Sequence, residues 1–264
     1  MVRTLALQDS ITPRNFIRDG ETLASASGFF ELGFFSLGSP NIIWCKKSPS
    51  TAFWVANRDA PINNDSGKGI SRLNDHGVLL LLDATDNAVW SSNYSSSRAY
   101  NPFAQLLDSG NIVVKNGRGS GSNGNLDQLS WQSFDHPCDT LMPGMKLGWS
   151  QQRGLDKFLS SWKSSDDPGG GDYIIKIDGK GYPQAIVLKG SEAKVRAGSW
   201  NGFYCTGFPS HNVDPLPTDE FVSNEIEVSY KYELTNNSIF HRYTVTPSGI
   251  CQRFGWAIKQ AAGR

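Results

Sequence analysis

The sequence has no excess of charge of either sign. Its 25 lysine and arginine residues are balanced by 25 aspartate and glutamate residues, so the formal net charge is +0 and the pI lies near 6.9. A domain that binds nucleic acid or an anionic membrane surface through its overall field carries a marked positive charge. The charge balance therefore argues against nucleic acid as a partner.

Long apolar runs are also lacking. No stretch approaches the ~18 consecutive apolar residues that a transmembrane helix requires, so we expect no membrane span in this chain. Near the N-terminus, the apolar patch is limited to Leu5, Ala6 and Leu7, whereas a signal peptide has an apolar core of about 7 to 15 residues. If the protein is secreted, we expect its leader to be missing from this sequence.

Cysteines are few and far apart. Cys45, Cys138, Cys205 and Cys251 form no CxxC pair, which a zinc site or a redox motif would normally show. We therefore expect no metal and no other cofactor. The cysteines allow several disulfide pairings, and buried free thiols and at least one disulfide stay open as alternatives.

Motifs for catalysis or calcium binding are weak. His136 and Cys138 are separated by one proline, and such a turn does not direct the two side chains toward each other, so we predict no catalytic dyad. Asp166, Asp167 and Asp172 surround a glycine-rich turn without the ordered ligands and closing glutamate of an EF-hand. We predict a solvated turn there, no metal ligand and no catalytic residue.

A glycine-rich stretch at residues 116–125, NGRGSGSNGN, contains the pattern GxGxxG of phosphate-binding loops. The residues that follow show neither an apolar helical period nor a VAIK-like lysine, and the chain has no HRD-to-DFG segment of a kinase. We interpret the stretch as a flexible linker, and we expect no enzymatic activity from this chain.

What the sequence does contain is typical of an all-β protein. It has 27 glycines, 8 tryptophans and 14 phenylalanines, and its short apolar runs are separated by glycine, asparagine, aspartate and serine. The stretch at 73–92, LNDHGVLLLLDATDNAVWSS, predicts a β-hairpin, and further strands are predicted at 20–23, 28–35, 52–57, 102–107 and 111–115. The echo of FWVANR in AVWSSN predicts a pseudosymmetric fold whose blades each bury one tryptophan.

Seven ordered motifs resemble the extracellular region of plant S-locus glycoproteins and of G-type lectin S-receptor-like kinases. They are FELGFFS, FWVANRD, AQLLDSGN, WQSFDHPCDTLMPGMKLG, FLSSWKSSDDP, GSWNG and QRF, and the resemblance extends from about Asp9 to Trp256. It implies an N-terminal segment at 1–18, a bulb-type lectin β-prism at 19–130 and a second lectin-like β module at 131–264. Within that module, residues 196–264 would be a truncated S-locus glycoprotein domain.

The last residues, AIKQAAGR, depart from the family pattern after Trp256. We therefore expect a chain truncated before the EGF-like, PAN, transmembrane and kinase parts of the full-length relatives. The resemblance implies an extracellular or cell-surface location, and it implies glycosylation at the N-x-Ser triplets of Asn64, Asn93 and Asn236.

The sugar motif of bulb lectins places Gln, Asp, Asn, Val and Tyr at alternate positions, so that all five side chains share one face of a strand. The matching positions here are Asn74, His76, Val78, Leu80 and Leu82 in one strand and Leu107, Ser109, Asn111, Val113 and Lys115 in another. Only Asn111 and Val113 keep the motif residue. We therefore predict an eroded, weak carbohydrate site at Asn74, His76, Asn111 and Val113, and a scaffold role for both strands.

Two functions follow as expectations. The first is a recognition module for a peptide or protein, with the stretch at 203–217, FYCTGFPSHNVDPLP, either as a partner surface or as an unconstrained linker. The family role would include recognition of pollen, and a homodimer or a heterodimer with receptor-like kinases is expected. The second is a mannose-type lectin that binds a glycan, with tryptophan or tyrosine rings stacked on the sugar.

Overall fold

We describe the fold from a computed structural model of the chain. The structure describes residues 9–35, 39–45, 48–60, 69–92, 101–117, 129–151, 154–179, 181–202, 217–236 and 239–257. These residues form β-strands and one short 3-10 helix, η2 (Ser133–Asp135), which confirms the predicted all-β class. None of the described helices has the length and apolar character needed to cross a membrane. The chain divides into two compact units, Met1–Phe134 and Asp135–Arg264.

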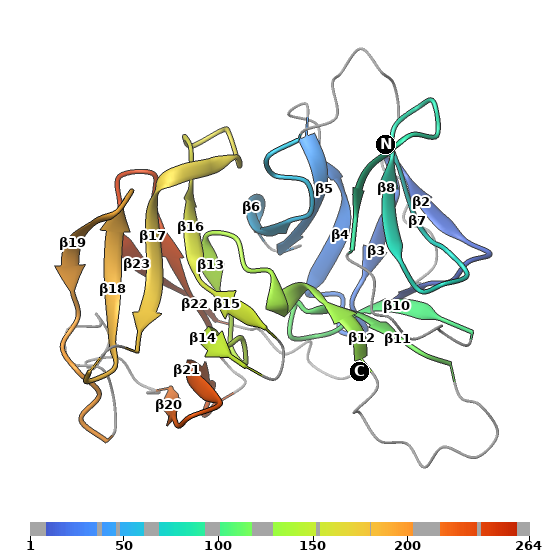
Figure 1. Cartoon of the computed structure of the whole chain (residues 1–264). Helices are drawn as coiled ribbons and strands as arrows, with labels where there is room; N and C mark the ends of the chain where they lie inside the picture. Colours follow the sequence, from blue (N-terminus) through green and yellow to red (C-terminus); the bar gives the residue numbers. More distant parts are fainter. Residues whose placement is uncertain are drawn as a thin grey trace. The chain divides into compact units, whose positions relative to one another are not determined.

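The first unit consists of three antiparallel sheets of four strands each (Figure 1). One sheet contains β3 (Thr22–Ala24), β4 (Phe30–Phe35), β5 (Ser39–Cys45) and β6 (Ser48–Val55). The next contains β2 (Phe16–Arg18), β7 (Ile70–Leu73), β8 (Leu79–Leu82) and β9 (Ala88–Ser91). The third contains β1 (Ser10–Ile11), β10 (Phe103–Leu106), β11 (Ile112–Lys115) and β12 (Leu129–Gln132). This is the pseudo-threefold β-prism that the resemblance implied.

A triangle of tryptophans joins the three sheets. Trp54 on β6, Trp90 on β9 and Trp131 on β12 pack edge to face, with 5.9 Å between the ring centroids of every pair. Edge-to-face pairs contribute about 0.5–1.5 kcal/mol each beyond the area that they bury. Of the two tryptophans on which the prediction of one buried tryptophan per blade rested, Trp54 is 5% exposed and Trp90 is half-buried; the third blade takes Trp131, 7% exposed, which was expected in the second module.

The hydrogen bonds beside the tryptophans repeat as well. Two residues after Trp90, the Ser92 hydroxyl accepts the Leu79 backbone N–H at 2.9 Å. Two residues after Trp131, the Ser133 hydroxyl accepts the Ile112 backbone N–H at the same distance. Both donors lie at the start of a central strand, so each serine satisfies a buried backbone group that would otherwise lose its hydrogen bond to water.

The structure places three strands differently from the expected domain bounds. Residues 10–18, expected as a separate N-terminal segment, supply β1 and β2, whose Ile11 and Ile17 are buried in the first unit. Trp131, expected to open the second module, lies on β12, which pairs with β11. The physical reason is that two of the prism's three sheets take an outer strand, β1 or β2, from a part of the chain distant in sequence, and that β12 continues the sheet of β11.

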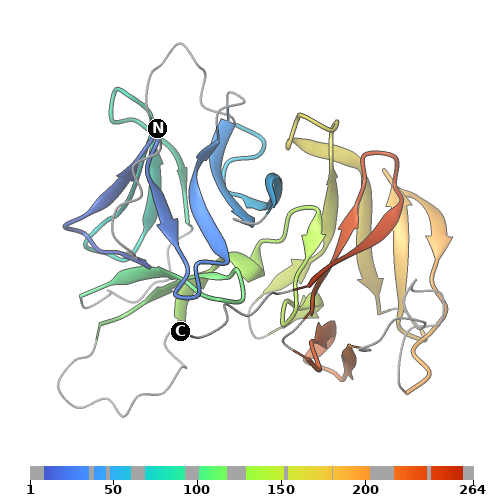
Figure 2. The ribbon, with the colours of Figure 1, turned by 180° about the vertical axis from the view of Figure 1, so that it is seen from behind.

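The second unit also contains three sheets. Two have four strands: β16 (Leu159–Trp162), β17 (Gly170–Asp178), β18 (Gln184–Lys189) and β19 (Glu192–Arg196) form one, and β15 (Leu155–Lys157), β14 (Leu147–Ser150), β21 (Glu227–Glu233) and β20 (Thr218–Ser223) form the other. The third contains β13 (Thr140–Leu141), β22 (Ile239–Val245) and β23 (Cys251–Ala257). Figure 2 shows β22 and β23, in red, joined by a tight turn.

Tyrosines fill the core of the second unit. Tyr230, Tyr232 and Tyr243 are each 1% exposed or less. The Tyr232 hydroxyl donates toward the backbone oxygens of His241 at 2.9 Å and Leu141 at 3.2 Å, which ties β21 to β22 and β13. Burial raises the pKa of Tyr232 well above its ordinary value, so the hydroxyl remains a donor throughout the physiological range.

Candidate recognition site

The first of the two motif strands, β8, turns its alternate residues to opposite sides. Leu79 and Leu81 point into the core and are 3% and 0% exposed, whereas Val78 and Leu80 are half-buried on the other face. Leu82 lies beyond a register irregularity and is buried as well. The strand positions that would face a sugar are therefore apolar, and they offer no hydrogen-bonding side chain.

The turn before β8 uses its one motif-position amide to hold itself together. The Asn74 side-chain oxygen accepts the backbone N–H groups of His76 at 3.0 Å and Val78 at 2.9 Å. Asparagine commonly stabilises turns in this way. His76 is exposed at the tip of the turn.

Asn111, at the start of the second motif strand, is 7% exposed and has both ends of its amide engaged. Its nitrogen donates to the Gln132 side-chain oxygen at 2.9 Å, and its oxygen accepts the Ser133 hydroxyl at 3.1 Å and the Phe134 backbone N–H at 3.2 Å. Val113 is 1% exposed. Asn111 thus fastens β11 to the segment that carries η2.

The four predicted carbohydrate-site residues fall into two groups. Asn74 and His76 lie in the turn between β7 and β8, while Asn111 and Val113 lie at β11, in a different sheet. The fold therefore does not assemble them into one site. Weak carbohydrate binding by either group stays a prediction.

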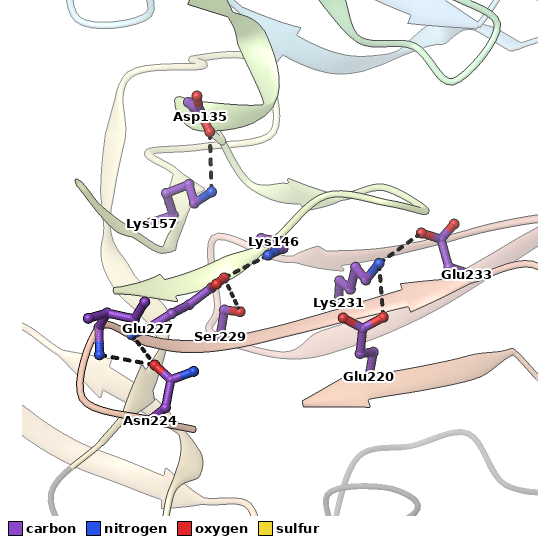
Figure 3. Close-up of polar contacts among 10 residues, drawn as sticks. Asp135, Lys146, Lys157, Glu220, Asn224, Glu227, Ser229, Lys231 and Glu233 are labelled. Carbon is purple, nitrogen blue, oxygen red and sulfur yellow. Dashed lines mark hydrogen bonds and ion pairs between the residues drawn. The ribbon is translucent and has the colours of Figure 1, made fainter. Parts of the chain in front are cut away.

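A polar face with a different arrangement lies on β14, β21 and β20 of the second unit (Figure 3). Along β21 the residues alternate, because Tyr230 and Tyr232 enter the core while Lys231 and Glu233 lie on the other face, on which Ser229 is covered and only 3% exposed. We call this surface the polar face. It consists of Lys146, Glu220, Glu227, Ser229, Lys231 and Glu233.

The side chains of the polar face are linked to one another. Glu227 Oε1 accepts from Lys146 Nζ at 2.7 Å and from the Ser229 hydroxyl at 2.6 Å. Lys231 Nζ lies 3.0 Å from a Glu220 carboxylate oxygen and 3.5 Å from one of Glu233. Glu220 is also the cross-strand partner of Lys231, so the sheet register places these opposite charges side by side.

These contacts shift the proton affinities in the expected directions. The hydrogen bond from Lys146, followed by that from Ser229, lowers the pKa of Glu227. The hydrogen bond to Glu220 is the main cause that raises the pKa of Lys231. Both charges are therefore held at neutral pH.

The turn before β21 is built like the turn before β8. The Asn224 side-chain oxygen accepts the backbone N–H groups of Ile226 at 3.0 Å and Glu227 at 2.8 Å (Figure 3). The two turns thus use asparagine in the same way, although the strands that they introduce differ. β8 presents apolar side chains outward, and β21 presents charged ones.

A buried ion pair lies beside the polar face in Figure 3. Lys157 Nζ is 3.2 Å from Asp135 Oδ1, and their side chains are only 8% and 9% exposed. Burial, opposed by the charge of Asp135, lowers the pKa of the neighbouring His136. A buried pair of this kind fixes the position of its segment, because a conformation that separates the two side chains leaves an uncompensated buried charge.

The other candidate residues have local roles. Asp166 accepts the Ser164 hydroxyl at 2.6 Å, Asp167 accepts the Gly169 backbone N–H at 2.9 Å, and Asp172 pairs with Lys189 at 3.8 Å. The carboxylates of the glycine-rich turn thus bind their own turn and strand. Among the described residues, no group of three or more His, Cys, Asp or Glu side chains is arranged to hold a metal.

Cys138 is buried and Cys251 is half-buried, and neither forms a disulfide with a described residue. Burial raises the pKa of Cys251 to about 11, which suppresses its reactive thiolate form. The Cys45 side chain and Cys205 lie outside the described residues, as do Asn64, Asn93 and the linker residues 118–125. Asn236 is exposed just after β21, and its glycosylation stays a prediction.

Sequence reasoning overlooked the polar face. A signal was present in the alternation of Glu227, Ser229, Lys231 and Glu233 along one strand. The partner Lys146 could not be assigned to it, because Lys146 lies 81 residues from Glu227.

Comparison with protein families identifies two domains in the chain. Residues 51–163 match the D-mannose binding lectin family, and residues 195–262 match the S-locus glycoprotein domain. The lectin match continues past the end of the first compact unit at Phe134. The chain therefore has one match to each of these two families, in separate stretches of the sequence.

Individual relatives agree with this assignment. The G-type lectin S-receptor-like serine/threonine-protein kinase SRK of Arabidopsis thaliana is 38% identical over 97% of this chain and 29% of its own length. The S-locus-specific glycoprotein BS29-2 of Brassica oleracea var. alboglabra is 38% identical over 91% of this chain and 55% of its own length. The chain is a homologue of S-locus glycoproteins and G-type lectin S-receptor-like kinases, and it spans less than two thirds of either relative.

Solved structures show a weaker likeness. The two-domain agglutinin of Scilla campanulata, described as a fetuin-binding protein, is 11% identical over 94% of this chain and 96% of its own, with a TM-score of 0.34. The mannose-specific agglutinin of snowdrop bulbs is 15% identical over 45% of this chain and 97% of its own, also with a TM-score of 0.34. At these values the likeness adds nothing to the account of the site.

Proposed function

We propose that this chain is an extracellular recognition module that binds a peptide or protein ligand through its second unit and carries out no catalysis. One observation carries the proposal: apart from His76, which is exposed in a turn, the motif positions of the first unit are either apolar or already hydrogen-bonded within the fold. The Asn74 oxygen holds a turn, and both ends of the Asn111 amide hold β11 to its neighbours. A monosaccharide needs several donors and acceptors at once, and each one left unmatched costs about 1–3 kcal/mol.

The polar face is our candidate for ligand contact. The side chains of Glu220 and Glu233 are 51% and 53% exposed, whereas Lys231 between them is only 23% exposed. A ligand approaching this surface therefore meets carboxylates before it meets the ammonium group. Charge complementarity across an interface mainly sets specificity and association rate, so a ligand with lysine or arginine side chains fits best.

The family resemblance supports the setting of this function. We propose a lectin-like architecture for the second unit, an extracellular location, and glycans at Asn64, Asn93 and Asn236. Pairing with a receptor-like kinase would couple ligand binding by this module to signalling. Of the stretch at 203–217, residues 203–216 lie outside the described residues, and a role in partner contact stays a prediction.

A peptide library displayed on phage and selected on the folded chain tests the proposal. We expect the selected peptides to be rich in lysine and arginine and to lose roughly tenfold in affinity for the double variant Glu220→Lys/Glu233→Lys. Glu192→Lys, which reverses an exposed charge on β19, is the matched control and should bind as the unaltered chain does. Equal binding to all three proteins would overturn the assignment to the polar face.

The second candidate is a mannose-type lectin, which the match to the D-mannose binding lectin family favours. A glycan array separates the two candidates. Saturable binding to mannose-containing glycans that is insensitive to Glu220→Lys/Glu233→Lys would support the lectin, and it would count against peptide recognition as the main function.

A further inference from the structure

The sheet of β2, β7, β8 and β9 in the first unit carries charge of one sign only. Among the residues of these four strands, Arg18 and Arg72 are the only charged side chains, and both are exposed. Their neighbours along the chain, Ile17 and Ser71, are 6% and 0% exposed. Because successive side chains of a strand point to opposite sides, both arginines lie on the outer face of this sheet.

The sheet register gathers apolar side chains around the two arginines. Arg72 lies directly opposite Phe16 on one side and Leu80 on the other, and Arg18 lies opposite Ile70. Residues directly opposite each other in an antiparallel pair share a face. Phe16 is 39% exposed, and Ile70 and Leu80 are half-buried. We call this surface the arginine face. It consists of Phe16, Arg18, Ile70, Arg72 and Leu80.

The guanidinium groups of the arginine face are placed to receive a carboxylate. The Arg18 guanidinium lies 4.4 Å from the centre of the Phe16 ring, a cation–π contact that holds it over the sheet. Strand cations of the second unit pair with carboxylates, for example Lys176 with Asp156 and Lys231 with Glu220. Within the described ranges of the chain, neither arginine of this face forms a salt bridge. A guanidinium binds a carboxylate through two parallel N–H donors.

Acidic residues lie in the turns at the ends of these strands and limit what can bind. Asp19 follows β2, Asp75 lies between β7 and β8, and Asp86 lies between β8 and β9; all three are exposed. Two more, Glu21 and Asp83, accept backbone N–H groups of their own turns. A flat anionic membrane or a polyanion would meet the exposed carboxylates as well as the arginines and be repelled. A narrow segment with one or two carboxylates can contact the arginines alone.

We propose that the arginine face binds a short polypeptide segment of a partner in which a glutamate or aspartate is flanked by apolar side chains. The ligand carboxylate accepts hydrogen bonds from Arg72 or Arg18, and the apolar side chains cover Phe16 and Leu80. A neutral sugar fits less well, because its hydroxyl groups both donate and accept, whereas the side chains of this face can only donate. The proposal does not depend on which ligand the polar face of the second unit binds.

A phage library of peptides with one central glutamate and no lysine or arginine tests the proposal. The absence of basic residues keeps the outcome independent of the basic ligand proposed for the polar face. We expect the unaltered chain to select peptides with apolar residues beside the glutamate. Their affinity should fall roughly tenfold or more for Arg18→Glu/Arg72→Glu. It should also fall for Arg18→Lys/Arg72→Lys, which keeps both charges but loses the paired donors of the guanidinium.

Lys115→Glu is the matched control and should leave the affinity unchanged. Lys115 is also a strand cation near an aromatic ring, 6.0 Å from the centre of Phe103, but it lies in another sheet of the first unit. Urea unfolding shows whether each variant folds, and the lysine variant decides if the charge reversal does not. No enrichment from the library, equal binding to both arginine variants, or equal binding of a selected peptide after its glutamate is changed to glutamine would each overturn the proposal. Binding to phosphatidylserine vesicles that Arg18→Glu/Arg72→Glu abolishes would overturn it in favour of a membrane surface.

Discussion

Replacing Asn111 by alanine separates a structural asparagine from a sugar-binding one. The substitution removes the acceptor of the Ser133 hydroxyl and the Phe134 N–H, and it removes the donor to Gln132. The Ser133 hydroxyl keeps its bond from the Ile112 N–H, so the buried Phe134 N–H carries most of the loss. An unsatisfied buried group costs about 1–3 kcal/mol, and with the other two bonds we expect the free energy of unfolding to fall by about 2–4 kcal/mol.

Urea unfolding followed by tryptophan fluorescence measures this loss in the absence of any ligand. Asn74→Ala is the matched control, because its two backbone donors lie in a partly solvated turn where water can replace the side chain, and it should cost about 1 kcal/mol. An Asn111→Ala variant as stable as the unaltered chain would contradict a structural role for Asn111. If that variant also lost a mannoside affinity that the unaltered chain possesses, Asn111 would be a sugar-binding residue instead.

Three further predictions concern the cores and the pH response. Trp131→Ala should lower the free energy of unfolding by about 3–5 kcal/mol and remove much of the near-ultraviolet circular dichroism of the tryptophan triangle. The control Trp149→Ala changes a side chain that is 41% exposed and should cost far less; equal losses would contradict the packing described. Lys157→Met leaves the Asp135 carboxylate buried without its ammonium partner and should lower the free energy of unfolding in urea by about 3–5 kcal/mol. The double variant Lys157→Met/Asp135→Asn should recover part of this loss, and no recovery would show that the ion pair is not the cause. Burial, aided by the charge of Arg253, lowers the pKa of His241 below its ordinary 6.5, so the unfolded chain takes up a proton that the folded chain does not, and the free energy of unfolding should fall as pH drops below about 6.5. His241→Phe should make the free energy of unfolding depend less on pH between 7 and 5, with the remaining dependence coming from His136. An unchanged pH dependence would contradict the assignment to His241.

Much of the first unit could be predicted because its signals are local. Turn residues, alternating apolar positions and the repeated tryptophans indicated the hairpins and the one tryptophan per blade that the structure confirms. Trp54, Trp90 and Trp131 recur at the end of each sheet, and the same physical need to fill the centre of a three-sided prism selects a large side chain each time.

The membership of the outer strands could not be predicted locally. β1 pairs with β10 across more than ninety residues, as the contact between Gln105 and Asp9 with a separation of 96 illustrates. Nothing in a short window reports such a pairing. The same holds for Trp131, whose strand looks like the start of a new module but completes the sheet of β11.

The site illustrates a second limit of sequence reasoning. Period-2 alternation predicted one shared face for the motif residues of β8, but it could not show the register irregularity that buries Leu82, nor that the corresponding face of β11 would be covered. Asn111 and Val113 are buried because Gln132, Ser133 and Phe134 return over them, a consequence of tertiary pairing. In the polar face only Lys146 was hidden for the same reason, since it lies 81 residues from its partner Glu227.

Calorimetric titration of the folded chain with methyl α-mannoside tests whether the motif strands bind sugar, with Asn111→Asp as a variant that keeps the shape of the side chain. We predict no saturable heat for either protein, because the motif amides are already bonded within the fold and, apart from the exposed His76, the other motif positions are apolar or already hydrogen-bonded. Saturable binding by the unaltered chain that Asn111→Asp abolishes would contradict this prediction and would restore the motif strands as a working sugar site.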